Sequence, residues 1–388
     1  MIEATLFKVL KFIKIRKDIL DMKFRCNKDV FLDAVMTTSR AASAKSTIPA
    51  LEGILLELDK NEMSLTGYNL EIGIRTTIQV ESDEKGSIVI NARRLGEIVR
   101  KMPPGTLDIV IEDNNSASIK NRTTKLSIMC MNADEYPQVP QANTENGFTM
   151  LQKTLKSMIT QTKYACAVTD TKPVFMGCLF EIKDNKLSVV GMDGLRIAVR
   201  EEPLNYEDTS FIVPARSLDE LSHMLNDEDG KEIKISTEKN QISFELGKKS
   251  MVSRLINGEF LDFHKYIKYG DSSLSVEINC SEMISSLERG MTMISEKVKI
   301  PLRCEFTSDT LTLSCTTSLG GYDEQINVKY SGEPFTIGLN TKLLLDAFKA
   351  SECSDVKFIM TGKSVEPVLI VPKEGSDFTF LIMPMRLK

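Results

Sequence analysis

The sequence predicts an α+β fold of three similar domains, each with two helices packed on one side of an antiparallel sheet. Three observations lead to this prediction. A β-hairpin, the helix that follows it and the strand after that helix each occur three times, with a spacing of about 124 residues. A period this long indicates separate domains, because the repeats of a solenoid are far shorter.

The hairpin of each repeat reads as a strand, a polar turn and a second strand. The three copies are Ile54–Gly67, Cys178–Gly191 and Arg303–Cys315. Glu57, Glu181 and Glu305 occupy the same position in the three copies and lie 124 residues apart each time. The hairpins therefore align as copies of one unit.

A helix is predicted next to each hairpin on both sides, because apolar residues recur there at helical spacing. The following helices are Ile90–Met102, Val213–Leu225 and Leu339–Phe348, and the preceding ones cover about 28–39, 151–164 and 281–294. A strand then starts at Asp108, Glu232 and Asp355. Alternation within the strands places one face of each sheet against the helices.

Domain boundaries are expected in polar or proline-containing stretches, which gives domains at 22–143, 144–268 and 269–388. Residues 1–21 would be an N-terminal extension. Lys8, Lys11 and Lys14 interrupt its apolar residues, which excludes a signal-peptide core and permits a basic amphipathic helix. The alternative is that translation starts at Met22 and that residues 1–21 are a mis-called or disordered extension.

Composition limits the class of function. The net charge of −5 is unusual for a protein that holds DNA by phosphate contacts alone, so a DNA role would need local charge or topology. The eight cysteines contain no CxxC pair, which argues against a zinc ribbon or a disulfide framework and fits buried thiols in a reducing cytosol. No apolar run reaches membrane-spanning length.

Catalytic interpretations find little support. His223 and His264 lie outside any metal or nucleophile motif, and Asp193 with Arg196 lacks an accompanying base, nucleophile or metal ligand. A metal-dependent nuclease, the competing hypothesis, predicts carboxylates clustered at strand ends, and none is evident. We therefore expect no enzymatic activity, no cofactor and no metal.

Three motifs, in order and at matching spacing, carry a resemblance to a known family. LTGYNLEI (Leu65–Ile72), MDGLRIA (Met192–Ala198) and IMPMRL (Ile382–Leu387) resemble the LTG-x-(D/N)-LE, TDGHRLA and C-terminal MPMRL elements of the β subunit of bacterial DNA polymerase III, the β sliding clamp. The resemblance runs from about Met22 to Leu387.

The resemblance implies a cytoplasmic, non-catalytic processivity factor. It implies a head-to-tail homodimer with six domains around a channel, which slides on duplex DNA without reading its sequence. The partners implied are the alpha-type subunit of DNA polymerase III, a clamp loader, repair polymerases, ligase and mismatch-repair proteins, with no membrane partner. A clamp paralogue specialised for repair or for a mobile element is the alternative.

The resemblance also implies a partner-peptide pocket between the second and third domains. Its walls would be Phe175, Met192, Gly194, Leu195, Arg196, Ile197, Leu261, Lys265, Tyr266, Val298, Asn340, Leu343, Val365, Pro367, Leu381, Ile382, Met383, Pro384, Met385 and Arg386. A mostly apolar groove suits peptides with hydrophobic anchors. Flexible methionines let one groove accept several partners, and Arg196 and Arg386 would hold polar groups of the peptide.

The sequence departs from the family pattern at this pocket. Leu195 replaces a frequent histidine, Met192 a threonine and Leu261 a proline, and Lys388 follows the usual last leucine. These changes make the groove more apolar and alter the peptide preference expected of it.

Basic residues on the second helices could contact phosphates without reading sequence, and the resemblance implies two further loop positions, Lys45 and Lys172. The DNA-binding candidates are Lys45, Arg93, Arg94, Arg100, Lys172, Arg216 and Lys342, with Lys101, Lys153, Lys156, Lys163 and Lys349 on the same helices or on the helix before them. The alternative is that they are ordinary solvated charges. By resemblance, the dimer interface would include Lys125, Leu126, Met293 and Ile294.

Overall fold

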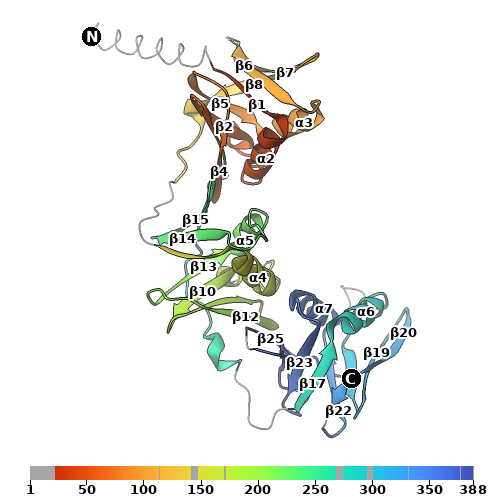
Figure 1. The fold of residues 1–388 in the computed structure, drawn as a ribbon. Helices are drawn as coiled ribbons and strands as arrows, with labels where there is room; N and C mark the ends of the chain where they lie inside the picture. The colour runs from red at the N-terminus through yellow and green to blue at the C-terminus, as the bar shows by residue number, and fades with distance from the viewer. Residues whose placement is uncertain are drawn as a thin grey trace. The chain divides into compact units, whose positions relative to one another are not determined.

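A computed structural model describes residues 22–112, 114–140, 147–169, 172–267, 274–294, 300–330, 332–375 and 377–387 (Figure 1). The predicted extension at 1–21 and the pocket candidate Val298 lie outside these residues. The chain divides into two compact units. The first contains the chain up to Gln152 together with His223–Arg254, and the second contains Lys153–Ser222 and everything from Leu255 onward.

The first unit is built on a twelve-stranded sheet with the order β1-β6-β7-β8-β5-β2-β3-β4-β16-β15-β14-β9. Its strands are β1 (Lys23–Asn27), β2 (Gly53–Asp59), β3 (Glu62–Tyr68), β4 (Ile72–Gln79), β5 (Lys85–Asn91), β6 (Thr106–Glu112), β7 (Ser116–Asn121), β8 (Thr124–Asn132), β9 (Gly147–Leu151), β14 (Glu232–Glu238), β15 (Gln241–Leu246) and β16 (Lys249–Arg254). Its helices are α2 (Lys28–Ser39) and α3 (Ala92–Lys101), with short 3-10 turns η1 (Pro49–Glu52) and η2 (Ala133–Glu135). The helices pack on the apolar face of the sheet around Phe31, Val35 and Leu95, all fully buried.

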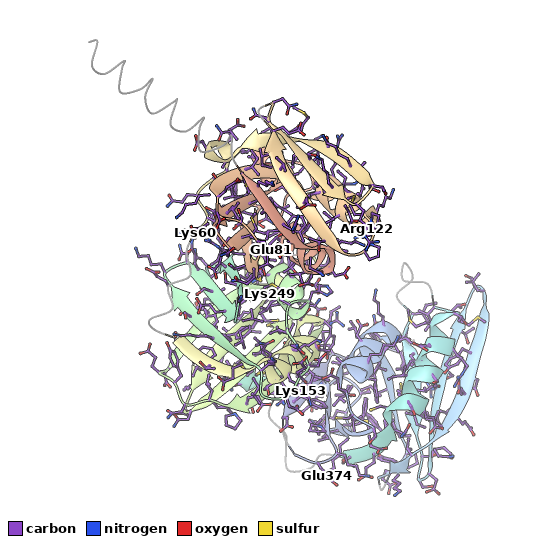
Figure 2. The ribbon with its side chains drawn as sticks, turned by 45° about the horizontal axis from the view of Figure 1, so that its top comes forward. Lys60, Glu81, Arg122, Lys153, Lys249 and Glu374 are labelled. Atoms are coloured by element: carbon purple, nitrogen blue, oxygen red, sulfur yellow. The ribbon has the colours of Figure 1, made fainter. Side chains whose placement is uncertain are left out.

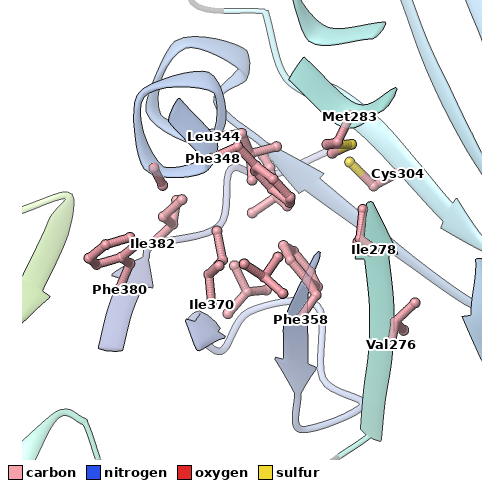
Figure 3. Packing of buried hydrophobic residues seen from close by; sticks show 14 of the residues in the cluster. Val276, Ile278, Met283, Cys304, Leu344, Phe348, Phe358, Ile370, Phe380 and Ile382 are labelled. Carbon is pink, nitrogen blue, oxygen red and sulfur yellow. The ribbon is translucent and has the colours of Figure 1, made fainter. Parts of the chain in front are cut away.

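The second unit contains a nine-stranded sheet, β13-β10-β11-β12-β25-β24-β23-β17-β21, and a four-stranded sheet, β20-β19-β18-β22. Its strands are β10 (Gly177–Lys183), β11 (Lys186–Met192), β12 (Arg196–Pro203), β13 (Thr209–Pro214), β17 (Leu274–Asn279), β18 (Leu302–Phe306), β19 (Thr310–Thr317), β20 (Gly320–Asn327), β21 (Lys329–Tyr330), β22 (Phe335–Leu339), β23 (Asp355–Met360), β24 (Val368–Pro372) and β25 (Phe378–Ile382). Its helices are α4 (Gln152–Lys163), α5 (Ala215–Ser222), α6 (Cys280–Met291) and α7 (Thr341–Ala350), with 3-10 turns η3 (Pro173–Met176) and η4 (Phe263–Lys265). Figure 3 shows Leu344 and Phe348 of α7 packed over Phe358, Ile370 and Phe380 of the nine-stranded sheet.

The strand orders confirm the threefold repeat. Each repeat contains two groups of four strands. The group with the hairpin has the order β5-β2-β3-β4, β13-β10-β11-β12 or β22-β18-β19-β20. The other group has the order β1-β6-β7-β8, β9-β14-β15-β16 or β17-β23-β24-β25. Two helices accompany each repeat, so the predicted α+β class and the three domains are confirmed. The helices differ from their predicted ranges by a few residues at their ends, where periodicity is least informative.

Asparagine side chains begin four of these helices. Asn27 Oδ1 accepts hydrogen bonds from the main-chain N–H groups of Asp29 and Val30, at 2.8 and 3.3 Å. Asn91, Asn279 and Asn340 cap α3, α6 and α7 in the same way. An N-cap amide satisfies main-chain donors that the first turn leaves unpaired, so these helix starts are encoded locally.

One glycine position fixes how a helix meets the hairpin. A Cβ atom on Gly67 would lie 2.0 Å from the carbonyl oxygen of Thr38, and one on Gly191 would lie 2.1 Å from that of Thr162. These glycines are 124 residues apart, and each lets the preceding helix lie directly on the second hairpin strand. The Thr38 and Thr162 hydroxyls both donate back into their own helix. The two repeats therefore share a helix–strand contact in detail.

Hairpin turns carry residues with positive φ, as two-residue turns require. Lys60 between β2 and β3 has φ 57°, and Arg122 between β7 and β8 has φ 45° (both labelled in Figure 2). In the second hairpin, Asp184 and Asn185 both have positive φ. Polar turn residues in the sequence thus end the strands where the pattern predicts.

The cysteines are free thiols, as expected. Six of the eight are buried and the other two are half-buried. Burial raises the pKa of Cys26 and of Cys304 to about 12, which makes both poor nucleophiles at neutral pH. Among the residues that the structure describes, no helix is both long and apolar enough to span a membrane.

Candidate binding groove

The floor of the predicted pocket is an apolar patch on one face of the β11-β12-β25 junction. Met192 lies opposite Ile197 across β11 and β12, and Ile197 lies opposite Leu381 across β12 and β25. All three are buried in a cluster that also contains Phe175 and Phe263. Apolar strand residues therefore bring four predicted pocket residues together: Phe175, Met192, Ile197 and Leu381.

Strand alternation separates this floor from the core of the third domain. On β25, Leu381 belongs to the groove cluster, whereas its neighbours Phe380 and Ile382 belong to the core beneath α7 (Figure 3). Ile382 packs in the core cluster beneath α7 and not in the groove cluster, so its predicted place in the pocket wall is wrong for the side chain. Only its main chain, paired with Arg196, adjoins the groove.

Exposed apolar side chains lie around the buried floor. Leu195 is 53% exposed and Met383 39%, and the main-chain N–H of Met383 donates to the carbonyl of Leu195 at 2.9 Å. Leu261 and Tyr266 also expose large apolar surfaces in the segment that follows β16. Gly194 has φ 86° in the turn before Leu195, a conformation that favours glycine. Exposed apolar side chains thus adjoin the buried apolar cluster of the predicted groove.

Arg196 has a different role from the one the resemblance assigns. Its Nε lies 3.0 Å from Asp193 Oδ2, its Nη1 lies 2.8 Å from Asp346 Oδ2, and its guanidinium stacks on Tyr164 at 5.2 Å. Its side chain is only 11% exposed. The guanidinium is thus already paired with groups of the same chain, and it links the β11–β12 turn to Asp346 of α7 and to Tyr164, which directly follows α4. Arg386 is exposed and is the better candidate for a polar group of a peptide.

Asp193 is a turn-forming residue. Its Oδ1 accepts from the main-chain N–H groups of Leu195 and Arg196, at 2.9 and 3.1 Å. A carboxylate with this many internal donors is held in place to shape the turn. The Asp193–Arg196 pair, which the sequence raised as a catalytic candidate, is therefore structural.

The C-terminal segment lies beside β22 and pairs with its main chain. The main-chain N–H of Met385 donates to the carbonyl of Gly338 at 2.8 Å, and a Cβ at Gly338 would lie 2.4 Å from the carbonyl oxygen of Met385. Only glycine permits this approach. Pro384 and Met385 are half-buried as a result, whereas Met383 stays exposed.

The other predicted pocket residues occupy the periphery or the core. Val365 is 77% exposed and Pro367 is half-buried, both in the loop before β24, and Lys265 is exposed beside Tyr266. Leu343 packs against the third domain's core, and Asn340 is the N-cap of α7. Both residues therefore have a structural role in α7.

Sequence reasoning missed the residues that support the groove from behind. Tyr164 and Asp346 hold Arg196, and Phe260 packs on Phe175 with ring centroids 6.0 Å apart. His264 Nε2 lies 2.9 Å from Glu181 Oε2 at the edge of the same cluster. Phe260 could have been found, because it lies 124 residues after Tyr136; Asp346 carries no local signal.

Basic candidates for DNA contact are exposed on the second helix of each repeat or in loops, with some engaged in ion pairs. Arg93, Arg94 and Arg100 lie on α3, where Arg93 pairs with Glu97 at 3.1 Å and Arg100 donates to Met36 Sδ at 3.2 Å. Arg216 is the second residue of α5 and Lys342 the second of α7. Lys45 lies in the loop after α2, and Lys172 Nζ lies 5.5 Å from the centre of the Phe175 ring. Lys163 pairs with Asp219 and Lys349 with Glu288, so these two are partly neutralised.

The interface candidates on the first domain lie on an open strand. Residues 124–129 of β8 pair with β7, and 130–132 pair with β5, so the outer side of 124–129 pairs with no strand that the structure describes. Leu126 is 39% exposed there, and Lys125 pairs with Glu112 at 3.3 Å. Beyond α6, Met293 is half-buried, whereas Ile294 is buried in its own unit, so the Ile294 side chain is corrected to a packing role.

Metal chemistry gains no support from the described part of the chain, which contains no group of three or more His, Cys, Asp and Glu side chains placed to hold an ion. The arrangement instead offers an apolar groove, open strand edges and basic helix surfaces.

Comparison with known proteins gives one consistent result. Residues 22–140, 149–262 and 270–386 match the sequence profiles of the N-terminal, central and C-terminal domains of the DNA polymerase III beta subunit. The beta sliding clamps of Staphylococcus epidermidis and Halalkalibacterium halodurans are 28% and 29% identical, over 94% of this chain and 99% and 100% of theirs. A solved structure described as a DNA polymerase III beta subunit from Eubacterium rectale matches with 30% identity and a TM-score of 0.87, over 94% of this chain and 99% of that one. The sliding clamp of Bacillus subtilis matches with 26% identity and a TM-score of 0.89, over 95% and 100%.

Proposed function

Because this chain belongs to the DNA polymerase III beta subunit family, the bacterial DNA sliding clamps, we propose that two copies close head to tail around duplex DNA. Its function is that of a DNA sliding clamp, a non-catalytic processivity factor of DNA replication. The proposed domains are 22–143, 144–268 and 269–388.

The order of the strands carries the proposal of a closed ring. The last strand of each hairpin sheet pairs with the last strand of the other sheet of the following repeat, as β4–β16 and β12–β25. In the described part of the chain, one strand of each kind makes no such pairing. These are β20, the last strand of the third hairpin sheet, and β8, the last strand of the other sheet of the first repeat. Pairing β20 of one copy with β8 of the next repeats the same junction, and a two-fold arrangement closes it. Lys125, Leu126 and Met293 are the proposed interface residues.

Topological enclosure suits the charge of the chain. A protein of net charge −5 gains little from phosphate contact overall, but a ring needs only a modest basic lining to follow DNA. Arg93, Arg94 and Arg100 on α3 are exposed, as are Arg216 on α5 and Lys342 on α7. We propose that these residues, with Lys45 and Lys172, contact phosphates without reading sequence.

The groove is proposed to take the linear peptides of partner proteins. Its buried floor and its exposed Leu195, Leu261 and Met383 favour peptides with large apolar anchors. Beyond the replicative polymerase, the proposed users are a clamp loader, repair polymerases, ligase and mismatch-repair proteins, in the cytoplasm.

Retention on DNA of two topologies tests the ring. Clamp loaded onto nicked circular DNA should remain bound through gel filtration, and linearising that DNA with a restriction enzyme should release it. Native mass measurement should give twice the mass of one chain. Equal loss from both templates would contradict the enclosure.

Removal of Met383–Lys388 tests the groove separately. This deletion takes away the exposed Met383 and the Met385–Gly338 main-chain bond, but no part of β8 or β20. Polymerase stimulation should be lost while the dimer persists. Stimulation retained by the truncated protein would overturn the groove assignment. A housekeeping clamp should also lose the polymerase to a competing peptide from that polymerase, whereas a specialised paralogue should not.

A further inference from the structure

Two strongly exposed apolar side chains lie beside open strand edges in different repeats. Leu319, 75% exposed, is in the turn that leads into β20, and Met129, 68% exposed, is on β8. β20 is the last strand of its four-stranded sheet (Figure 1), and the outer side of residues 124–129 pairs with no strand that the structure describes. Apolar residues next to an unpaired edge favour association with another strand.

The turn that contains Leu319 is equivalent to a turn in each of the other two repeats. In all three turns a side-chain oxygen accepts a hydrogen bond from the main-chain N–H two residues later. The acceptors are Asn69, Asp193 and Thr317, and the donors belong to Glu71, Leu195 and Leu319, at 3.0, 2.9 and 3.1 Å. Because these positions are 124 residues apart, Glu71 and Leu195 predict the environment of Leu319 once β20 is paired.

Within the chain, the carbonyl group at this position accepts a hydrogen bond from the following repeat. The Glu71 carbonyl accepts from the N–H of Arg254 at 3.0 Å, and the Leu195 carbonyl accepts from that of Met383 at 2.9 Å. Each bond continues the pairing of β4 with β16, or of β12 with β25, by one residue. The Leu319 carbonyl is therefore placed to accept a bond of the same kind.

Met129 is the residue of β8 that corresponds to Arg254. The hairpins β7–β8 and β15–β16 both have two-residue turns, and Met129 and Arg254 each lie opposite the first residue of the preceding strand. The N–H of Cys130 donates to the carbonyl of Asn115, which directly precedes β7, at 2.8 Å. Since successive N–H groups of a strand point to opposite sides, the N–H of Met129 points to the open side of β8.

We propose that Leu319 of one copy and Met129 of the next become direct neighbours across paired β20 and β8 strands, with the Met129 N–H donating to the Leu319 carbonyl. This inference rests on the proposed ring of two copies, and it specifies the register in which the junctions of that ring pair. The same register places Asp323 opposite Lys125, so opposite charges face each other across the junction.

The equivalent pair within the chain indicates how much cover this contact provides. Leu195 and Met383 are 53% and 39% exposed, less than the 75% and 68% of Leu319 and Met129. Side chains of direct neighbours in an antiparallel pair lie on the same face and interact. Ring closure therefore covers part of both apolar side chains, and this burial stabilises the junction.

Disulfide trapping tests the register in the full chain. Directly opposite residues that exchange main-chain bonds have Cα atoms about 5.5 Å apart, which is within the range of a disulfide. Oxidation by copper phenanthroline of a protein with both Leu319→Cys and Met129→Cys should therefore give a covalent dimer that a reducing agent separates. Val365→Cys with Met129→Cys is the matched control, because Val365 is 77% exposed but lies in the loop before β24. The control should give no more covalent dimer than Met129→Cys alone.

Removal of the apolar groups gives a second measurement. Leu319→Ala and Met129→Ala should each raise the dissociation constant of the dimer about tenfold, because a cross-strand pair is lost at both junctions of the ring. Val365→Ala should leave the dissociation constant unchanged. Analytical ultracentrifugation over a dilution series compares the three variants with the unsubstituted protein.

The outcomes separate the register from the ring. A dimer that forms normally but is not trapped by the cysteines at 319 and 129 overturns the register and leaves the ring in place. Equal trapping by the control pair, or unchanged dissociation of both alanine variants, also overturns the register. A native mass of one chain for the unsubstituted protein would refute the ring and the register together.

Discussion

The β3-β4-β16 junction and the β11-β12-β25 junction have the same strand order but opposite chemistry. Across the first, the aligned residues are Leu55, Thr66, Arg75 and Ser250; across the second they are Leu179, Val190, Val199 and Thr379. The second row is buried as far as Val199, whereas Arg75 in the first remains half exposed. The repeated backbone thus provides two equivalent junctions, and the side chains give each junction its own chemistry.

The aromatic residues beside the two junctions differ in the same sense. Tyr136 uses its hydroxyl to bond the main chain of Thr66, while its counterpart Phe260 packs its ring on Phe175. One residue is fixed by a polar contact and the other by an aromatic one. A duplicated element can therefore keep its position after its chemistry has changed.

The largest expected effect tests the part that the two junctions share. Gly67→Ala and Gly191→Ala each place a methyl group about 2 Å from a helix carbonyl oxygen, and each should lower the free energy of unfolding by about 3 kcal/mol or more. Urea unfolding followed by circular dichroism measures both. Gly96→Ala in α3 is the control: its added Cβ meets Met36 Sδ at 3.6 Å and Val35 Cγ1 at 3.9 Å, both ordinary contacts, so this change should stabilise the helix by about 0.5–1 kcal/mol. A large loss at only one of the two repeat positions would show that the shared contact is not equivalent.

The next effect separates the arginines of the two junctions. Arg196→Ala leaves Asp193 and Asp346 without their partner in a largely buried site and should cost about 3 kcal/mol of stability. Arg75→Ala removes a half-exposed pair and should cost about 0.5 kcal/mol or less. Thermal unfolding in matched buffer compares them. Arg196→Lys should fall between, because lysine keeps the charge but loses the two-pronged geometry. Similar losses for the two alanine variants would contradict the contrast drawn here.

The smallest effect exchanges the central residues of the two rows. Val190→Thr puts a hydroxyl into an apolar cluster and should destabilise the protein by about 1–3 kcal/mol. Thr66→Val removes an unsatisfied hydroxyl and should be neutral or stabilise it by about 1 kcal/mol. The two side chains have nearly the same shape, so packing cancels from the comparison. Urea midpoints that move in the same direction for both variants would refute the assignment of one row as polar and the other as apolar.

Much of the fold was predictable because its causes are local or periodic. The 124-residue spacing identified the three repeats, alternation and polar turns identified the hairpin strands, and apolar residues at helical spacing identified the helices. The resemblance placed Met192, Ile197 and Leu381 in one predicted groove, and the structure brings these three residues together across paired strands. Each of these signals is carried by residues close together in the chain or at a fixed interval.

Other features depended on the tertiary structure, because they join residues without a periodic relation. A strand buried on both faces does not reveal from its sequence which face meets which neighbour, so Ile382 was assigned to the groove although it packs beneath α7. Arg196 was expected to bind a peptide, but Asp346, 150 residues away, binds its guanidinium. The lack of a partner for the Thr66 hydroxyl likewise follows from the tertiary structure, in which β2, β4 and Tyr136 surround Thr66. Sequence determined the elements and their repetition; folding decided which polar groups found partners, since that depends on distances between segments far apart in the chain.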